Sequence, residues 1–100
     1  MDYKLIWTEE AIHNLENILD YLITNWSQTE VDKFKRKLSR QIELILQFPK
    51  MFPVSDYNPT LRKAVLSKQT TVFYQIKESE IYLVYLFVNR QDIKKVKSSK

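Results

Sequence analysis

Hydrophobic residues recur along this chain with two different periods, and the change of period marks the predicted elements. In the first quarter they return every three or four positions, the spacing of one apolar helical face, at Ile12, Leu15, Leu19, Leu22 and Trp26. A second series has the same spacing, at Val31, Phe34, Leu38, Ile42 and Ile45. The pattern predicts one helix over about residues 9–25 and another that continues to about Gln47.

Residues typical of helix starts locate both helices. Thr8 precedes Glu9 and Glu10, and a capping hydroxyl followed by first-turn carboxylates favours the start of a helix. Ser27 and Glu30 have the spacing of a capping box. The second helix must therefore begin almost where the first one stops. Two helices of similar length with almost no linker predict an antiparallel hairpin.

Four further segments are typical of strands, at residues 3–7, 61–66, 70–76 and 81–88. The last carries no charge, so we expect it to be an interior strand that is buried on both faces. One neighbour is the strand at 70–76, joined to it by residues 77–80 in a connection expected to contain a type I turn. The first strand, returning through the helices, is the other neighbour.

These elements predict an α+β fold in one domain, residues 1–100. An N-terminal strand and a helical hairpin precede a three-stranded antiparallel meander. The helices are expected to pack on one face of a four-stranded sheet with the order 1-4-3-2. The segment 48–59 contains all three prolines and cannot be regular structure. We interpret it as a loop held against the surface by its apolar side chains.

Composition excludes several classes of function. Glycine is absent, which excludes phosphate-binding loops of the Walker and dinucleotide types. Cysteine is also absent, which excludes disulfides and thiolate metal sites. No apolar run approaches the roughly 20 residues that span a bilayer, and the N-terminus has no signal-peptide pattern. We therefore expect a cytoplasmic protein that has no contact with membranes.

Candidate catalytic groups are few. The single histidine, His13, lies on the first predicted helix without the partners that triads and zinc sites need. The carboxylates are scattered, so no metal or other cofactor is expected. The remaining candidates are cations near the strands, which suit phosphate or carboxylate, at Arg62, Lys63, Lys68 and Arg90. We expect Arg62 and Arg90 at one end of the sheet, although Arg90 could instead pair with a carboxylate such as Asp92.

In their order and spacing, the segments resemble the RelE/ParE superfamily of toxins from bacterial type II toxin–antitoxin pairs. The resemblance spans nearly the whole chain and rests on IWTEEAIHNLENILDYLITNWS, ILQFPKMFP, LRKAVL, VFYQI and IYLVYLFVNRQDIKK. It implies the sheet-and-hairpin fold described above. It also implies a growth inhibitor that a cognate antitoxin neutralises.

The superfamily divides by activity. RelE-like members resemble metal-independent endoribonucleases that cut messenger RNA on the ribosome, with basic side chains and usually a C-terminal Tyr or His. Arg62 and Arg90 match two family arginines, but residues 91–100 contain neither Tyr nor His. ParE-like members carry no such catalytic set and inhibit DNA gyrase. The incomplete set favours the ParE-like activity, leaves open whether the chain is an enzyme, and keeps a non-toxic relative that only binds antitoxin as an alternative.

The resemblance also implies partners. One is a cognate antitoxin with an acidic toxin-binding tail, which the formal charge of +4 would suit. Its candidate contacts are the apolar loop residues Phe48, Met51, Phe52 and Tyr57, which could instead only cover the end of the core. The other expected partner is DNA gyrase, or in the RelE-like alternative the ribosome and messenger RNA.

Overall fold

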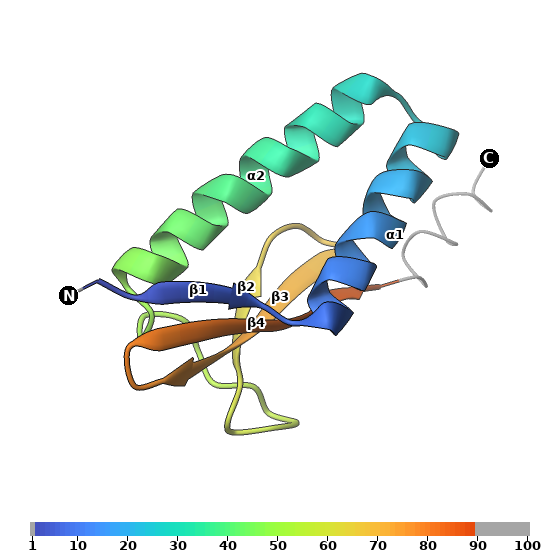
Figure 1. Ribbon diagram of the computed structural model, residues 1–100. Coiled ribbons are helices and arrows are strands. Elements are labelled where there is room, and N and C mark those ends of the chain that lie inside the picture. The colour runs from blue at the N-terminus through green and yellow to red at the C-terminus, as the bar shows by residue number, and fades with distance from the viewer. Residues whose placement is uncertain (1, 90–100) are drawn as a thin grey trace.

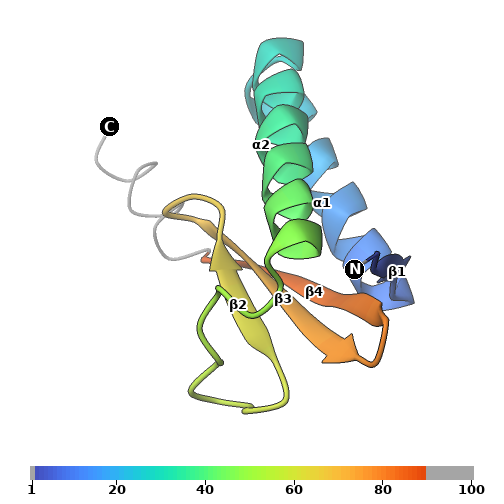
Figure 2. The ribbon, with the colours of Figure 1, turned by 90° about the vertical axis from the view of Figure 1, so that its left-hand side faces the viewer.

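The elements follow one another in the predicted order, and the computed structural model describes residues 2–89 of the chain. Their bounds are β1 Lys4–Trp7, α1 Glu9–Asn25, α2 Gln28–Gln47, β2 Arg62–Val65, β3 Thr70–Lys77 and β4 Glu80–Val88. The strands form one sheet in the order β1-β4-β3-β2, and both helices lie on the same face of it (Figure 1 and Figure 2). The predicted α+β fold, its antiparallel meander and its strand order are confirmed.

Both helix starts are capped as the sequence predicts. The amide of Ala11 donates to Thr8 Oγ1 at 3.1 Å, and the amide of Glu30 donates to Ser27 Oγ at 3.4 Å. Only Trp26 and Ser27 separate the two helices. Each capping hydroxyl satisfies one of the free N–H groups that every helix leaves at its first turn.

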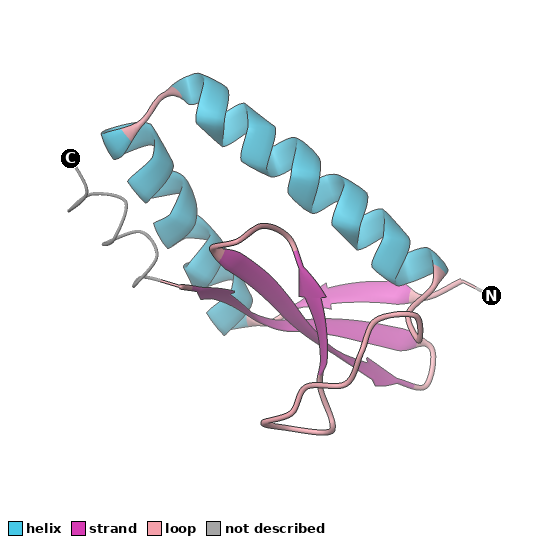
Figure 3. Ribbon diagram, turned by 180° about the vertical axis from the view of Figure 1, so that it is seen from behind, coloured by secondary structure: helices cyan, strands magenta, loops and turns pink. Residues whose placement is uncertain are grey.

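The helical hairpin is open. The helices meet at their short link and diverge from it toward the sheet (Figure 3). Ile12 and Ile23 of α1 are exposed, and so is Trp26 between the two helices. Within the predicted apolar stripe, Leu15, Leu19 and Leu22 are partly buried, whereas Ile12 and Trp26 at its two ends are exposed.

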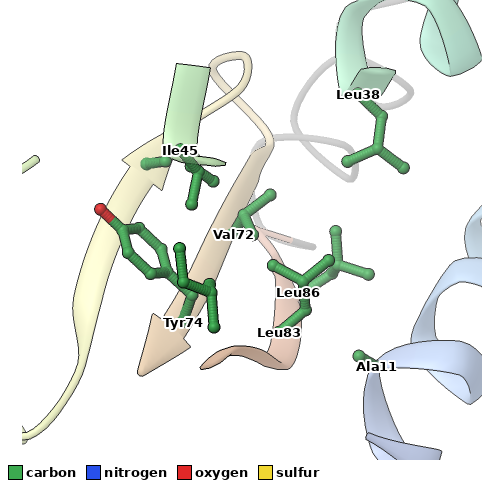
Figure 4. Close-up of a cluster of buried hydrophobic side chains, with 9 residues drawn as sticks. Ala11, Leu38, Ile45, Val72, Tyr74, Leu83 and Leu86 are labelled. Atoms are coloured by element: carbon green, nitrogen blue, oxygen red, sulfur yellow. The ribbon is translucent and has the colours of Figure 1, made fainter. Parts of the chain in front are cut away.

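The core lies between the helix pair and one face of the sheet. Figure 4 shows Tyr74 of β3 with Leu83 and Leu86 of β4 on the side of the sheet where Leu38 and Ile45 of α2 lie. Such a layer of interlocked apolar side chains is the main source of stability in a domain of this size.

The interior position of β4 is confirmed, since it pairs with β1 in parallel and with β3 in antiparallel fashion. Its burial on both faces is wrong. Ile81, Leu83 and Leu86 are buried, whereas Tyr85 is only half-buried and Phe87 is exposed. The reason is that, within residues 2–89, no helix or strand covers the face of the sheet opposite the helices (Figure 2).

A β-bulge in β4 sets which of its residues face the core. Phe73 pairs with Tyr85 but Tyr74 pairs with Leu83, so Val84 is an extra residue in the ladder. The bulge changes the alternation of inward and outward positions. Leu83 and Leu86 consequently both face the helices although they are three positions apart.

The β3–β4 connection differs from the expected type I turn. Lys77 pairs with Glu80, which leaves Glu78 and Ser79 as the loop, and Glu78 has φ of 54°. A type I turn has negative φ at both central positions. A two-residue hairpin needs a positive φ to match the twist of its strands, and in a chain without glycine that conformation falls on Glu78.

The loop between α2 and β2 is fixed at several points, in agreement with the interpretation of a surface-held segment. The amide of Lys63 donates to the carbonyl of Pro53, and the amide of Ser55 donates to the carbonyl of Leu61. These bonds lay residues 53–55 along the outer edge of β2 at its start. This part of the sheet edge is therefore not free for another strand.

Candidate functional site

The predicted cations do not gather in one place. Arg62 is opposite Tyr74 in the β2–β3 ladder and Lys63 is opposite Phe73, so the two cations lie on opposite faces of the sheet. Arg62 is on the face covered by the helices and Lys63 on the uncovered one. Lys68 lies in the turn that follows β2.

Arg62 holds the loop that precedes it. Its Nη1 atom donates to the carbonyl oxygen of Phe52 at 2.6 Å and to that of Lys50 at 3.3 Å. A guanidinium group can hold two acceptors at once because its N–H donors have a fixed planar arrangement. The side chain predicted to contact an anion is thus engaged with the main chain of its own loop.

Arg90 lies outside the described residues, so its predicted place beside Arg62 stays a prediction. The structure locates only the end of β4, which precedes Arg90. The amide of Asn89 donates to the carbonyl of Gln69 at 2.7 Å, which places the end of β4 at the turn that contains Lys68. Arg62 is at the start of β2, toward the other end of the sheet. Strands β2 and β4 run the same way, so the start of one lies far from the end of the other.

The uncovered face of the sheet is rich in aromatic side chains that sequence reasoning did not group together. This open sheet face carries Lys63, Phe73, Tyr82, Tyr85 and Phe87, as the ladder register requires. The rings of Phe73 and Tyr85 stack with centroids 4.7 Å apart. Alternation along β3 could have suggested Phe73, but Tyr82 and Tyr85 share a face only because of the bulge at Val84.

Two tyrosines have pKa values that burial and neighbours raise. Burial raises the pKa of Tyr74 to about 12, although the positive charge of Arg62 acts in the opposite direction. The Tyr74 hydroxyl also donates to the carbonyl of Pro49 at 2.6 Å. The pKa of Tyr82 is raised by its hydrogen bond to Glu80 Oε1 at 2.9 Å. Both phenols therefore stay protonated at neutral pH, and neither is suited to remove a proton.

The described residues contain no other assembled set of reacting groups. His13 is exposed on α1. Between residues 2 and 89 there is no group of three or more His, Asp or Glu side chains that could hold a metal ion. No buried side-chain nitrogen or oxygen in this range lacks a hydrogen-bond partner.

The loop residues predicted to contact an antitoxin divide into two groups. Phe52 is partly buried and packs edge-to-face against Tyr74, with ring centroids 6.1 Å apart. Phe48, Met51 and Tyr57 are exposed, with 96% of the surface of Tyr57 accessible. Phe48 and Met51 line a shallow pocket beside the start of β1 together with Tyr3, Gln47, Pro49 and Lys50.

A second candidate surface lies at the C-terminal end of α2. It consists of the exposed apolar residues Leu44, Phe48 and Met51, which we call the apolar end. Leu44 precedes Phe48 by one helical turn and is also exposed. Contiguous exposed apolar side chains of this kind are typical of sites that bind a partner. As to membranes, neither helix in the described part of the chain is long and apolar enough to cross one.

Comparisons with known proteins agree with this architecture. A family model described as the ParE toxin of the type II toxin–antitoxin system parDE matches residues 5–93. Among solved structures, the chain is similar to the chromosomal ParDE toxin–antitoxin system from P. aeruginosa, with a TM-score of 0.73 and 19% identity over 86% of this chain and 95% of that one.

Two other toxin structures show the same likeness of fold. The YoeB/ParE toxin from Agrobacterium tumefaciens matches with a TM-score of 0.65 and 13% identity, covering 86% of this chain and 98% of that chain. The E. coli DinJ–YafQ toxin–antitoxin complex matches with a TM-score of 0.62 and 7% identity, covering 91% and 97%. A search of curated proteins finds no match.

Proposed function

The chain belongs to the ParE toxin family of type II toxin–antitoxin systems, within the RelE/ParE superfamily, and we propose that it arrests growth by inhibiting DNA gyrase rather than by cutting messenger RNA. In this proposal the toxin carries out no covalent chemistry. Gyrase itself breaks the DNA, and the bound toxin keeps the break open.

The observation that carries this proposal is the lack of an acid–base pair among the described residues. Cleavage of RNA needs one group that activates the 2′-hydroxyl and another that protonates the leaving oxygen. Tyr74 and Tyr82 have raised pKa values, and Arg62 is engaged with loop carbonyls. A toxin that acts by binding needs none of these groups.

Supercoiling of relaxed plasmid by purified gyrase, with the toxin added in increasing amounts, tests this function. We expect supercoiling to fall and linear DNA to accumulate. The variant His13→Ala should inhibit supercoiling as well as the wild type does, because this exposed side chain has no role in the proposed mechanism. Unchanged supercoiling together with cleavage of ribosome-bound messenger RNA would establish the RelE-like alternative instead.

We further propose that the cognate antitoxin binds the apolar end through an acidic segment that folds on binding. Leu44, Phe48 and Met51 would supply the buried contacts, and Lys50 beside them would attract the acidic segment. Tyr57 projects from the same loop and would add a contact. Phe52 is left out of this surface because it packs against Tyr74.

Titration calorimetry with the product of the neighbouring small reading frame tests this surface. Phe48→Ala combined with Met51→Ala should weaken binding by at least about tenfold, as loss of central apolar contacts does at interfaces. Ile23→Ala is the matched control, since Ile23 is similarly exposed on the other helix. Equal losses for both variants would contradict the assignment.

A further inference from the structure

Four cations lie on one face of α2, and no part of the proposed function uses them. They are Lys33, Arg36, Lys37 and Arg40, which we call the α2 ridge. A rotation of about 100° per residue places all four within an arc of roughly 100°, spread over about 10 Å of the helix axis. The spacing i, i+3, i+4, i+7 is that of one helical face.

The α2 ridge faces away from the protein. The buried residues of α2 are Val31, Leu38 and Ile45, and the same rotation places them roughly opposite the ridge. All four ridge residues are exposed. No other element of residues 2–89 covers this side of α2 (Figure 1 and Figure 2). The ridge is thus free to meet a partner without any rearrangement of the fold.

Few of the ridge cations form ion pairs within the described part of the chain. Within the described range, the only ion pair joins Lys33 Nζ to Glu30 Oε2 at 3.6 Å. Both partners are exposed, so this pair contributes little and yields easily to another anion. Arg36, Lys37 and Arg40 have no carboxylate within the range of an ion pair among residues 2–89. Three adjacent free cations and one weakly paired cation create a local positive potential.

The surroundings of the ridge suit a nucleic acid better than a protein. From Thr29 to Glu43, every exposed side chain of α2 is polar. Protein interfaces depend on a desolvated apolar or aromatic centre, which this surface lacks. Protein–DNA interfaces are more polar and much more positive. A duplex also presents about one negative charge per 1.7 Å of its axis, so a row of four cations meets several phosphates.

We propose that the α2 ridge binds the phosphate backbone of duplex DNA, without reading its sequence. This inference goes beyond the proposed action on gyrase and does not depend on it, since the contact is a property of the toxin alone. Arg36 and Arg40 can each hold two phosphate oxygens, whereas Lys33 and Lys37 act as point charges. Affinity should therefore fall steeply as salt is added.

The test is fluorescence anisotropy of a labelled random duplex, titrated with the full-length toxin at several salt concentrations and without gyrase. The ridge variant is K33Q/R36Q/K37Q/R40Q. The matched control is K94Q/K95Q/K97Q/K100Q, which also removes four cations. Starting from a formal charge of +4, both variants have a formal charge of 0. Any difference between them therefore reports the position of the charges and not their number.

We expect the wild type to bind the duplex and the ridge variant to bind at least about tenfold more weakly at 0.1 M salt, with a log–log salt slope shallower by about 3. The control variant should bind the duplex more tightly than the ridge variant, because it keeps the four ridge cations. R36Q and R40Q alone should each reduce the slope by about 1, which keeps the test valid if the fourfold variant unfolds.

Three results would overturn the proposal. One is a wild type that does not bind the duplex at low salt, and another is a ridge variant that binds as tightly as the control. The third is displacement of the DNA by a poly-glutamate peptide at equal charge concentration, with loss of peptide binding in the ridge variant. That result would assign the ridge to an acidic polypeptide. None of these outcomes depends on whether the toxin inhibits gyrase.

Discussion

Arg62 illustrates how a side chain chosen for its anion-binding chemistry can serve the fold. Its guanidinium joins the start of β2 to the carbonyls of Phe52 and Lys50, and Tyr74 beside it reaches the carbonyl of Pro49. Together these bonds fix the loop that carries Phe48 and Met51. Loss of the Arg62 bonds or of the Tyr74 bond should therefore lower the free energy of unfolding of the protein.

Arg62→Lys tests this structural role, because lysine keeps the charge but cannot reproduce the planar arrangement of donors. We expect the free energy of unfolding in urea to fall by about 1–2 kcal/mol. Lys63→Gln on the open sheet face should change it by no more than about 0.5 kcal/mol. Full stability of Arg62→Lys combined with loss of growth inhibition would instead assign Arg62 to a target contact.

Tyr74 should make the fold sensitive to alkali. Burial raises its pKa to about 12, above the ordinary value of 10.0 that unfolding restores. The folded chain holds the phenolic proton more tightly, so this contribution to stability is complete below pH 10 and is lost as the pH rises from 10 to 12. Between pH 8 and pH 11 the free energy of unfolding should fall by about 1.4 kcal/mol more for the wild type than for Tyr74→Phe. Urea titrations of both proteins at the two pH values would measure this difference. Identical losses would contradict a raised pKa of Tyr74.

Glu78 occupies a backbone conformation that glycine would adopt more easily. A residue with a side chain in the left-handed conformation costs about 1–2 kcal/mol, which glycine would avoid. Glycine also makes the unfolded chain more flexible, and this offsets part of the stabilisation. We expect Glu78→Gly to raise the free energy of unfolding by about 0.5–1 kcal/mol. Ser79→Gly is the control, because Ser79 has no positive φ and should gain nothing. Thermal unfolding of the two variants would compare them.

At the scale of elements, the start of α1 completes the sheet where β1 is too short. β1 ends opposite Leu83, and beyond that point the Thr8 hydroxyl donates to the carbonyl of Val84 at 2.7 Å. Further along, the amide of Leu86 donates to Asn14 Oδ1 at 3.0 Å. Helix side chains thus replace the missing strand and satisfy backbone groups that would otherwise be unpaired.

Asn14→Ala should destabilise the fold, since it leaves the Leu86 amide without an acceptor. We expect a loss of about 1–2 kcal/mol in the free energy of unfolding. Asn17→Ala changes the same residue type at an exposed position of the same helix and shares any gain in helix propensity. Amide exchange at Leu86 would show directly whether protection is lost. Equal stability of both variants would rule out a role for this bond.

Local sequence patterns predicted the helices and strands themselves better than they predicted the contacts between these elements. Hydroxyl caps and apolar spacing located both helices, and the uncharged run at 81–88 identified the central strand. The Asn14–Leu86 bond joins residues far apart in the chain, so nothing local announces it. The bulge at Val84 depends on pairing with β3, and without it the shared face of Tyr82 and Tyr85 could not be derived.

The candidate site was less predictable for the same reason. Residue type suggested Arg62 as a side chain that contacts phosphate or carboxylate. It could not show that Arg62 instead binds the carbonyl oxygens of Phe52 and Lys50. Likewise Phe48, Met51 and Tyr57 are exposed whereas Phe52 packs against the core, a division that depends on how the loop folds back on β2.

At the scale of the whole molecule, three different surfaces surround one small core. The apolar end lies where α2 meets the loop, and the open sheet face lies opposite the helices (Figure 2). The α2 ridge lies on the side of α2 roughly opposite its buried residues. The formal charge is distributed unevenly along the chain. Residues 90–100 contain five of the sixteen basic residues and one of the twelve acidic ones, which equals the whole formal charge of +4. Residues 1–89 are therefore balanced overall, and the ridge is a local feature.

Separate surfaces allow antitoxin and target to be distinguished by mutation. We expect substitutions at the apolar end to weaken antitoxin binding while the isolated toxin keeps its effect on growth. Such variants should escape neutralisation when toxin and antitoxin are expressed together. Variants of the α2 ridge should remain fully neutralised.

The most direct test of the proposed action is induced expression of the toxin without antitoxin, with DNA and protein synthesis followed in the same culture by pulse labelling. Inhibition of gyrase predicts that incorporation of thymidine falls first while incorporation of amino acids continues. Arrest of amino acid incorporation while DNA synthesis continues would contradict it, and so would undiminished growth.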